Sequence, residues 1–181
     1  LREIQQGIVL GRERYLECES ILRDLVENFP DNLEFRRVLA NQLSNHGNSY
    51  VMISDPESKN GPNFEMAGRL FSESSRQWRI LVEEENEISE YCFRLGQSLD
   101  YEANCLLKRR TELERALQLA KEAVKQYEAA RRLKPDSGDH SPATATIGRA
   151  YDLVANLGHF YLAHDQDAID ATKNAIRCAD M

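Results

Sequence analysis

The sequence predicts an all-α protein, an α-α superhelix in which about seven helices stack as antiparallel pairs. Apolar residues recur at steps of three and four along most of the 181 residues, which is the period of a helix face. The turn formers, 9 Gly and 5 Pro, fall mostly between these periodic segments. The chain also resembles itself at a fixed offset, which indicates a repeat architecture.

The first half of the chain divides into four predicted helices. One ends before Pro30, and the next begins after Asp31 and Asn32, either of which can cap a helix. A run of turn formers, 54–63, predicts one long loop. Beyond it, two helices are marked by periodic apolar residues, Phe64, Ala67, Phe71, Trp78 and Leu81 in one and Tyr91, Leu95, Leu99 and Leu106 in the other.

The second half contains the clearest helix, from Glu112 to Leu133, with an apolar face and an opposite charged face. The string from Lys134 to Gly138 predicts its end. A further helix is predicted around 147–161 and a short last one over 168–178.

The chain contains an internal repeat that places the segment 15–50 on the segment 71–106. This alignment gives nine identities over 36 positions without a gap, and the apolar positions agree in phase. A third occurrence repeats the spacing of Asn45, Gly47 and Tyr50 at Asn156, Gly158 and Tyr161. We therefore predict a single repeat domain, 1–181, with units near 1–30 (partial), 31–84, 87–134 and 142–181.

Each unit carries a small residue followed three positions later by a larger apolar or aromatic one. The small residue is expected where the paired helices approach most closely, and the larger one fills the space one turn along. These packing positions are Gly47 and Tyr50, Ala103 and Leu106, and Gly158 and Tyr161.

At these residues the chain resembles the tetratricopeptide repeat (TPR) family. The string Leu157-Gly158-His159-Phe160-Tyr161 is similar to the start of such a repeat, and 167–175 is similar to its second helix. The first two units are longer than the family's unit of about 34 residues. The strings at 25–31 and 35–40 further resemble degenerate repeats found C-terminal to the kinase domain in planctomycete-type bacterial serine/threonine protein kinases.

The resemblance implies a concave groove lined by the first helix of each pair. Carried over to this sequence, the groove positions are Asn41, Ser44, Asn48, Gln97, Asp100, Asn104, Asp152, Ala155 and His159. Such hydrogen-bonding side chains suit the binding of an extended peptide. The alternative interpretation is that they are ordinary solvated surface positions. TPR domains that clamp a C-terminal carboxylate use Lys and Arg beside these asparagines. Ser44 and Asp100 stand there instead, so we expect a neutral or basic partner.

The composition further narrows the classes of partner that the chain is expected to bind. Lys and Arg total 23 against 30 Asp and Glu, a net charge of −7, which argues against nucleic acid. No apolar run approaches the roughly 20 residues of a membrane span. The start at Leu1 indicates a fragment of a longer protein. The four scattered cysteines are expected to be reduced and structural, which favours the cytoplasm, compatible with a membrane-anchored parent.

No catalytic motif is recognised, and no cofactor or metal is expected. A kinase would need a Gly-rich phosphate loop, a catalytic loop and a magnesium-binding element, and none is present in this sequence. His159 and His164 are five apart and would point about 140° from each other on a helix. The sequence therefore predicts a non-enzymatic protein-binding scaffold, such as the docking tail of a bacterial signalling kinase. A structural spacer or self-association module is the alternative, and a helical metal-dependent enzyme using His159, His164 and Asp165 is the outsider.

Overall fold

The computed structural model describes residues 2–52, 62–134, 142–162 and 165–179. This part of the chain forms helices and no strand, so the predicted all-α class is confirmed. Seven α-helices and one π-helical segment, η1, follow one another: α1 (Arg2–Asn28), α2 (Leu33–Met52), α3 (Phe64–Glu84), α4 (Ser89–Arg109), α5 (Leu113–Leu133), α6 (Pro142–Asn156), η1 (Leu157–Leu162) and α7 (Asp165–Ala179).

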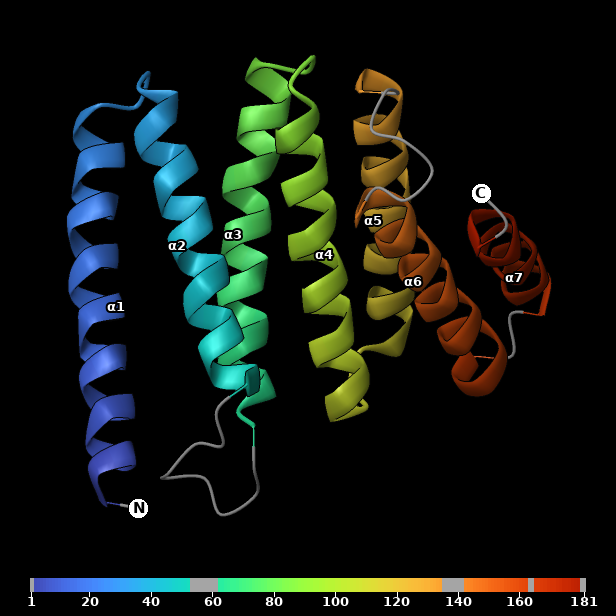
Figure 1. Ribbon diagram of the computed structural model, residues 1–181, viewed down its shortest axis with the longest axis horizontal. Coiled ribbons are helices and arrows are strands. Elements are labelled where there is room, and N and C mark those ends of the chain that lie inside the picture. Colours follow the sequence, from blue (N-terminus) through green and yellow to red (C-terminus); the bar gives the residue numbers. More distant parts are fainter. Residues whose placement is uncertain (1, 53–61, 135–141, 163–164, 180–181) are drawn as a thin grey trace.

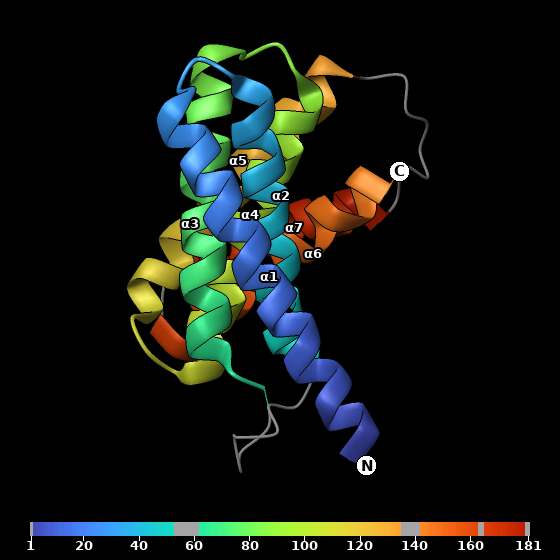
Figure 2. The same ribbon diagram turned by 90° about the vertical axis from the view of Figure 1, so that its left-hand side faces the viewer.

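Consecutive helices run antiparallel and lie side by side, so the chain order is also the spatial order of the stack (Figure 1). Each helix packs mainly on its neighbours in sequence, from α1 against α2 to α6 against α7. Figure 2 shows that α6 and α7 are steeply inclined to the direction shared by α1 to α5. Because α6 diverges from α4, a hollow opens between these two helices.

The helix boundaries have local causes, and the sequence predicts one of them, the cap at the start of α2. The Asn32 side chain accepts from the backbone N–H groups of Glu34 at 3.1 Å and Phe35 at 3.3 Å, so Asn32 caps α2. Asn63 caps α3 through Met66 N at 3.0 Å. Arg110 ends α4 in the left-handed conformation, with φ of 54°. The predicted loop residues 54–61 and the turn residues 135–138 lie outside the described part of the chain.

The internal repeat is visible in the helix boundaries themselves. α1 ends at Asn28 and α2 begins at Leu33, while α3 ends at Glu84 and α4 begins at Ser89. The sequence alignment places Asn28 on Glu84 and Leu33 on Ser89. One repeat therefore consists of two helices and the segments that connect them. The predicted units 31–84, 87–134 and 142–181 contain the pairs α2/α3, α4/α5 and α6/α7.

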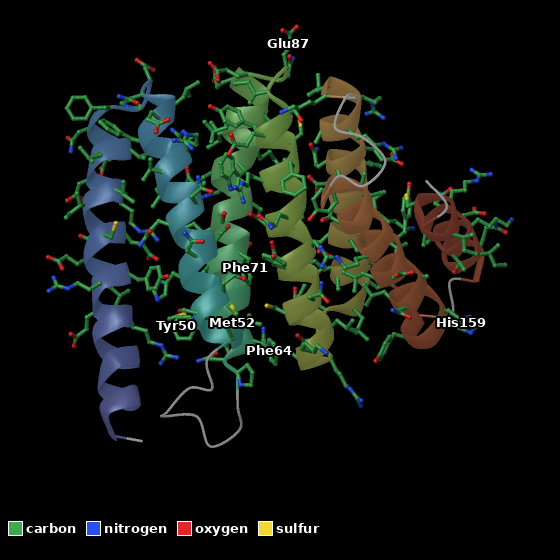
Figure 3. All side chains as sticks on the ribbon, viewed as in Figure 1. Tyr50, Met52, Phe64, Phe71, Glu87 and His159 are labelled. Carbon is green, nitrogen blue, oxygen red and sulfur yellow. The ribbon has the colours of Figure 1, made fainter. Side chains whose placement is uncertain are left out.

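Glycines allow aromatic rings to pack tightly between paired helices. A Cβ on Gly47 of α2 would lie 2.9 Å from the Phe71 ring of α3 (Figure 3). In α4 a similar contact is made by Gly96, at a different repeat position from Gly47: a Cβ there would lie 2.9 Å from the Tyr127 ring of α5 and 3.1 Å from the Ala123 backbone oxygen. Ala103 is fully buried in the same core as these α4 and α5 residues.

The predicted packing position Tyr161 needs correction. Tyr50 and Leu106 are buried at 9% and 6% exposure, but Tyr161 is 44% exposed. The reason is the switch from α6 to the π-helical segment η1 after Asn156. A π-turn holds more residues than an α-turn, so every later side chain is rotated about the helix axis. Tyr161 thereby leaves the face that a regular α-helix would give it.

Candidate functional site

Two adjacent hollows open along α6. The first, here called the α4–α6 hollow, has a volume of about 460 Å³ and is lined by α4, α6 and Tyr127 of α5. The second, the α6–α7 hollow, measures about 690 Å³ and is lined by α6, η1 and α7. Asp152 and Asn156 line both. Each volume falls in the range of about 300–1,000 Å³ that is usual for ligand pockets.

The structure brings together most of the groove residues that the sequence predicts on α4, α6 and η1. Gln97, Asp100, Asn104 and Asp152 all line the α4–α6 hollow. Ala155 and His159 line the α6–α7 hollow, and Figure 3 shows His159 near the end of α6. Six of the nine positions that the resemblance implies thus line one or other of these two hollows.

The predicted groove residues of α2 lie elsewhere. Asn41 and Asn48 are half-buried on α2 and line neither hollow. The Ser44 hydroxyl lies 2.8 Å from that of Ser74 on α3 and 3.3 Å from that of Ser98 on α4. Ser44 thus takes part in the packing of three helices, and its assignment to an open groove needs correction.

The polar side chains of α4 are held in place by their own helix. The Asn104 amide donates to the Asp100 backbone oxygen at 2.9 Å and to Asp100 Oδ1 at 3.2 Å. Gln97 accepts from Arg94 at 3.1 Å and donates to the Tyr101 hydroxyl at 3.3 Å. These contacts limit the rotamers of the side chains before any partner arrives, which lowers the entropy lost on binding.

Burial dominates the electrostatics of the α4–α6 hollow. It raises the pKa of Asp100 to about 6, and Arg149 of α6 opposes the rise. Tyr127 is only 1% exposed, and its hydroxyl has no protein hydrogen-bond partner. Burial also raises the pKa of this phenol. The exposed residues of the lining carry both signs of charge: Lys108 on α4 and Arg149 on α6 are cationic, and Asp152 on α6 is anionic.

The Tyr127 hydroxyl is a feature that the sequence reasoning missed. Periodicity places residue 127 on the apolar face of its helix, where tyrosine and phenylalanine are equivalent. Only the residue type could have drawn attention to this hydroxyl. A buried tyrosine usually finds a hydrogen-bond partner for its O–H.

A second polar centre that the sequence did not reveal joins α1 to α2. His46 Nδ1 lies 2.6 Å from Glu19 Oε1, and both side chains are almost fully buried. The Tyr15 ring stacks on His46 with centroids 4.8 Å apart, and Tyr50 packs against it at 5.1 Å. Arg23 adds a cation 3.7 Å from the other Glu19 oxygen. The cluster is internal, so we assign it to helix packing.

A hollow of about 630 Å³ lies between α3, α4 and the start of α5, and it is lined by arginines and glutamates. These charges are paired with one another: Arg115 with Glu102 at 2.6 Å, and Arg69 with Glu65 at 2.7 Å. Because the charges already satisfy each other, this surface stabilises the stack and offers no excess charge to a ligand.

The described residues give no support to a metal-binding site. In the described ranges, no group of three His, Cys, Asp or Glu side chains is placed to hold a metal ion. Of the residues considered for a metal-dependent enzyme, His164 and the side chain of Asp165 lie outside the description. None of the described helices has both the length and the apolar character of a membrane-spanning segment.

Comparisons with known proteins do not place the chain in a family. No protein-family model matches it, and no curated protein matches it either. Among solved structures, the crystal structure of BtubC (BKLC) from P. vanneervenii aligns with 96% of this chain and 91% of that one, at 11% identity and a TM-score of 0.22. A TM-score this low supports no argument about fold or function.

Proposed function

We propose that this chain is a non-enzymatic protein-interaction scaffold that binds an extended segment of a partner along the α4–α6 and α6–α7 hollows. The observation that carries the proposal is the pair of adjoining hollows, which share Asp152 and Asn156 and are lined by polar side chains of successive helices. An extended peptide can place alternate side chains in neighbouring hollows and its backbone against the amides between them.

The partner is proposed to be neutral or basic. Asp100 and Asp152 both line the α4–α6 hollow, and their carboxylates disfavour an acidic segment. The resemblance to TPR-like repeats C-terminal to bacterial kinase domains supports a more specific proposal, that the chain is a cytoplasmic docking tail of a larger signalling protein.

A peptide array tests the proposal directly. Fluorescently labelled chain is applied to random peptides, and the bound sequences are measured again by fluorescence anisotropy. Asn156→Arg places a long side chain in the wall shared by both hollows, and we expect it to weaken binding about tenfold or more, a loss of roughly 1.4 kcal/mol.

The matched control is Gln118→Arg, the same kind of substitution at an exposed position of α5. It should leave peptide affinity unchanged. The proposal fails if the unaltered chain binds no peptide above background, or if Asn156→Arg and Gln118→Arg behave alike.

Self-association is the alternative, and exposed apolar side chains on the two outer helices favour it. Leu16 of α1 and Ile176 of α7 are 56% and 55% exposed, and the ends of a helical stack are its natural contact surfaces. Sedimentation velocity separates the two functions. A sedimentation coefficient that rises with protein concentration supports self-association, and a constant monomer value excludes it.

A further inference from the structure

The α4–α6 hollow contains a carboxylate, Asp100, that among the described residues lacks the cationic partner found at the other buried carboxylates. Glu19 is paired with His46 and Arg23, and Glu102 is paired with Arg115. Asp100 accepts a hydrogen bond from the neutral Asn104 amide.

Among the residues that the structure describes, none forms an ion pair with Asp100, although Arg149 acts on it electrostatically. A desolvated carboxylate without a cation is an expensive arrangement for a folded protein.

The same hollow contains a second polar group without a protein partner. The Tyr127 hydroxyl is buried and unpaired, while Tyr127 lines the hollow together with Asp100. A buried hydroxyl without a partner is uncommon, because its desolvation is not compensated. Two groups on different helices that line one hollow are therefore incompletely satisfied: the Asp100 carboxylate has no cation among the described residues, and the buried Tyr127 hydroxyl has no hydrogen bond.

Resting on the proposed function, we infer that the α4–α6 hollow receives a lysine or arginine side chain of the bound segment, with its cationic head facing Asp100 and the Tyr127 hydroxyl. The ammonium or guanidinium group supplies the cation that the Asp100 carboxylate lacks in the described part of the chain and a donor for the Tyr127 hydroxyl oxygen. Its aliphatic stem lies against Leu107 and Leu153, which line the same hollow.

The charged groups of the hollow lie at different depths, and this arrangement favours a bound cation over a bound anion. Asp100 is half-buried, and Lys108 and Arg149 are exposed at the rim. The two rim cations can contact backbone carbonyl oxygens of the segment in high dielectric, where repulsion of a further cation is weak. A carboxylate entering the hollow would instead meet the Asp100 carboxylate, whose charge burial already disfavours.

Binding should weaken in acid. Burial raises the pKa of Asp100 to about 6, so below this pH Asp100 is mostly protonated and neutral. The other titratable or charged groups that line the hollow are Tyr101 and Lys108 on α4, Tyr127 on α5, and Arg149 and Asp152 on α6. A bound cation favours the ionised form of Asp100, so its pKa should fall when the hollow is occupied.

The test uses three small probes with the same backbone: the N-acetyl methylamides of lysine, norleucine and glutamate. Each is titrated into the ¹⁵N-labelled chain at pH 7.5, and amide shifts are followed by NMR. We expect saturable shifts in α4 and α6 with the lysine probe, and binding about tenfold weaker or absent with the norleucine and glutamate probes. Lowering the pH to 5 should weaken the lysine response several-fold.

Variants then assign the contact. Asp100→Asn should reduce the affinity for the lysine probe about tenfold, and Tyr127→Phe, which removes only the hydroxyl, about threefold. Asp24→Asn makes the same change of charge at an exposed position of α1 and should have no effect. The inference is overturned if the lysine probe gives no saturable shifts, if the glutamate probe binds as well, or if Asp100→Asn matches Asp24→Asn.

The outcome is separable from that of the proposed function. If array peptides bind but show no preference for lysine or arginine, the inference about the hollow fails and the scaffold function stands. If the lysine probe binds at α4 and α6 while no peptide binds, the hollow takes cations but the scaffold proposal fails.

Discussion

Asp100→Asn is expected to stabilise the free protein at neutral and alkaline pH and to lose this effect in acid. The substitution preserves shape, and the new amide oxygen can still accept from the Asn104 amide, which lies 3.2 Å from Asp100 Oδ1. It therefore removes the charge and little else. The carboxylate is unfavourable in the fold because burial raises its pKa from 3.8 to about 6.

The direction in which stability changes with pH follows from the number of protons that the folded and unfolded states bind. Between pH 4 and pH 6 the folded state of Asp100 binds more protons than the unfolded state, so stability falls as the pH rises through this window. At about 1.4 kcal/mol per pKa unit, the rise from 3.8 to about 6 corresponds to at most about 3 kcal/mol. Because the hollow admits water, we expect Asp100→Asn to add about 1–2 kcal/mol above pH 7 and nearly nothing at pH 4.

Urea denaturation followed by circular dichroism, repeated from pH 4 to pH 8, measures this difference directly. The exposed residue Asp24 provides the control Asp24→Asn, which should remain within about 0.5 kcal/mol of the unaltered chain at every pH. A gain from Asp100→Asn that is constant with pH, or a loss of stability near pH 8, would refute a desolvated, unpaired carboxylate at this position.

Further substitutions and one chemical treatment test the packing. Gly96→Ala should destabilise by about 1–3 kcal/mol in a urea titration, because its Cβ meets a ring and a backbone oxygen. Gly11→Ala, also within a helix but with open space, should stabilise by about 0.5–1 kcal/mol. Glu19→Ala leaves His46 buried without its 2.6 Å partner and should lower the thermal midpoint, with a loss of about 2–4 kcal/mol. Burial raises the pKa of Cys105 to about 12, so iodoacetamide should modify it far more slowly in the native than in the unfolded chain, as mass spectrometry of peptides would show.

The fold could be predicted because its causes are local. Periodic apolar residues set the helices, and asparagines and prolines mark their ends, as Asn32 does for α2. The internal repeat then indicated the order in which helices pair, since it places the first residue of α2, Leu33, on the first residue of α4, Ser89. A stack in which each helix contacts its sequence neighbours needs little long-range information.

What could not be predicted depends on contacts between distant residues or on a local change of helix type. His46 and Glu19 are 27 residues apart, and nothing in their spacing indicates that they meet. The position of Tyr161 depended on a regular α-helix, but the chain is π-helical from Leu157. The unpaired state of the Tyr127 hydroxyl follows from the absence of donors and acceptors within reach on the described neighbouring helices, which a periodic pattern does not encode.

One repeat position illustrates how the same fold gives a closed contact in one unit and an open hollow in the next. The internal repeat matches Ser44 with Asp100, and the two occupy equivalent places on α2 and α4. At the first, hydroxyls of α2, α3 and α4 meet within 2.8–3.3 Å, so the side chain takes part in helix packing. At the second, the equivalent side chain is a carboxylate and α6 inclines away from α4 (Figure 2). Because the stack is held together by the buried faces of neighbouring helices, the residue at this position can change from helix packing to lining a hollow without disturbing the helices that carry it.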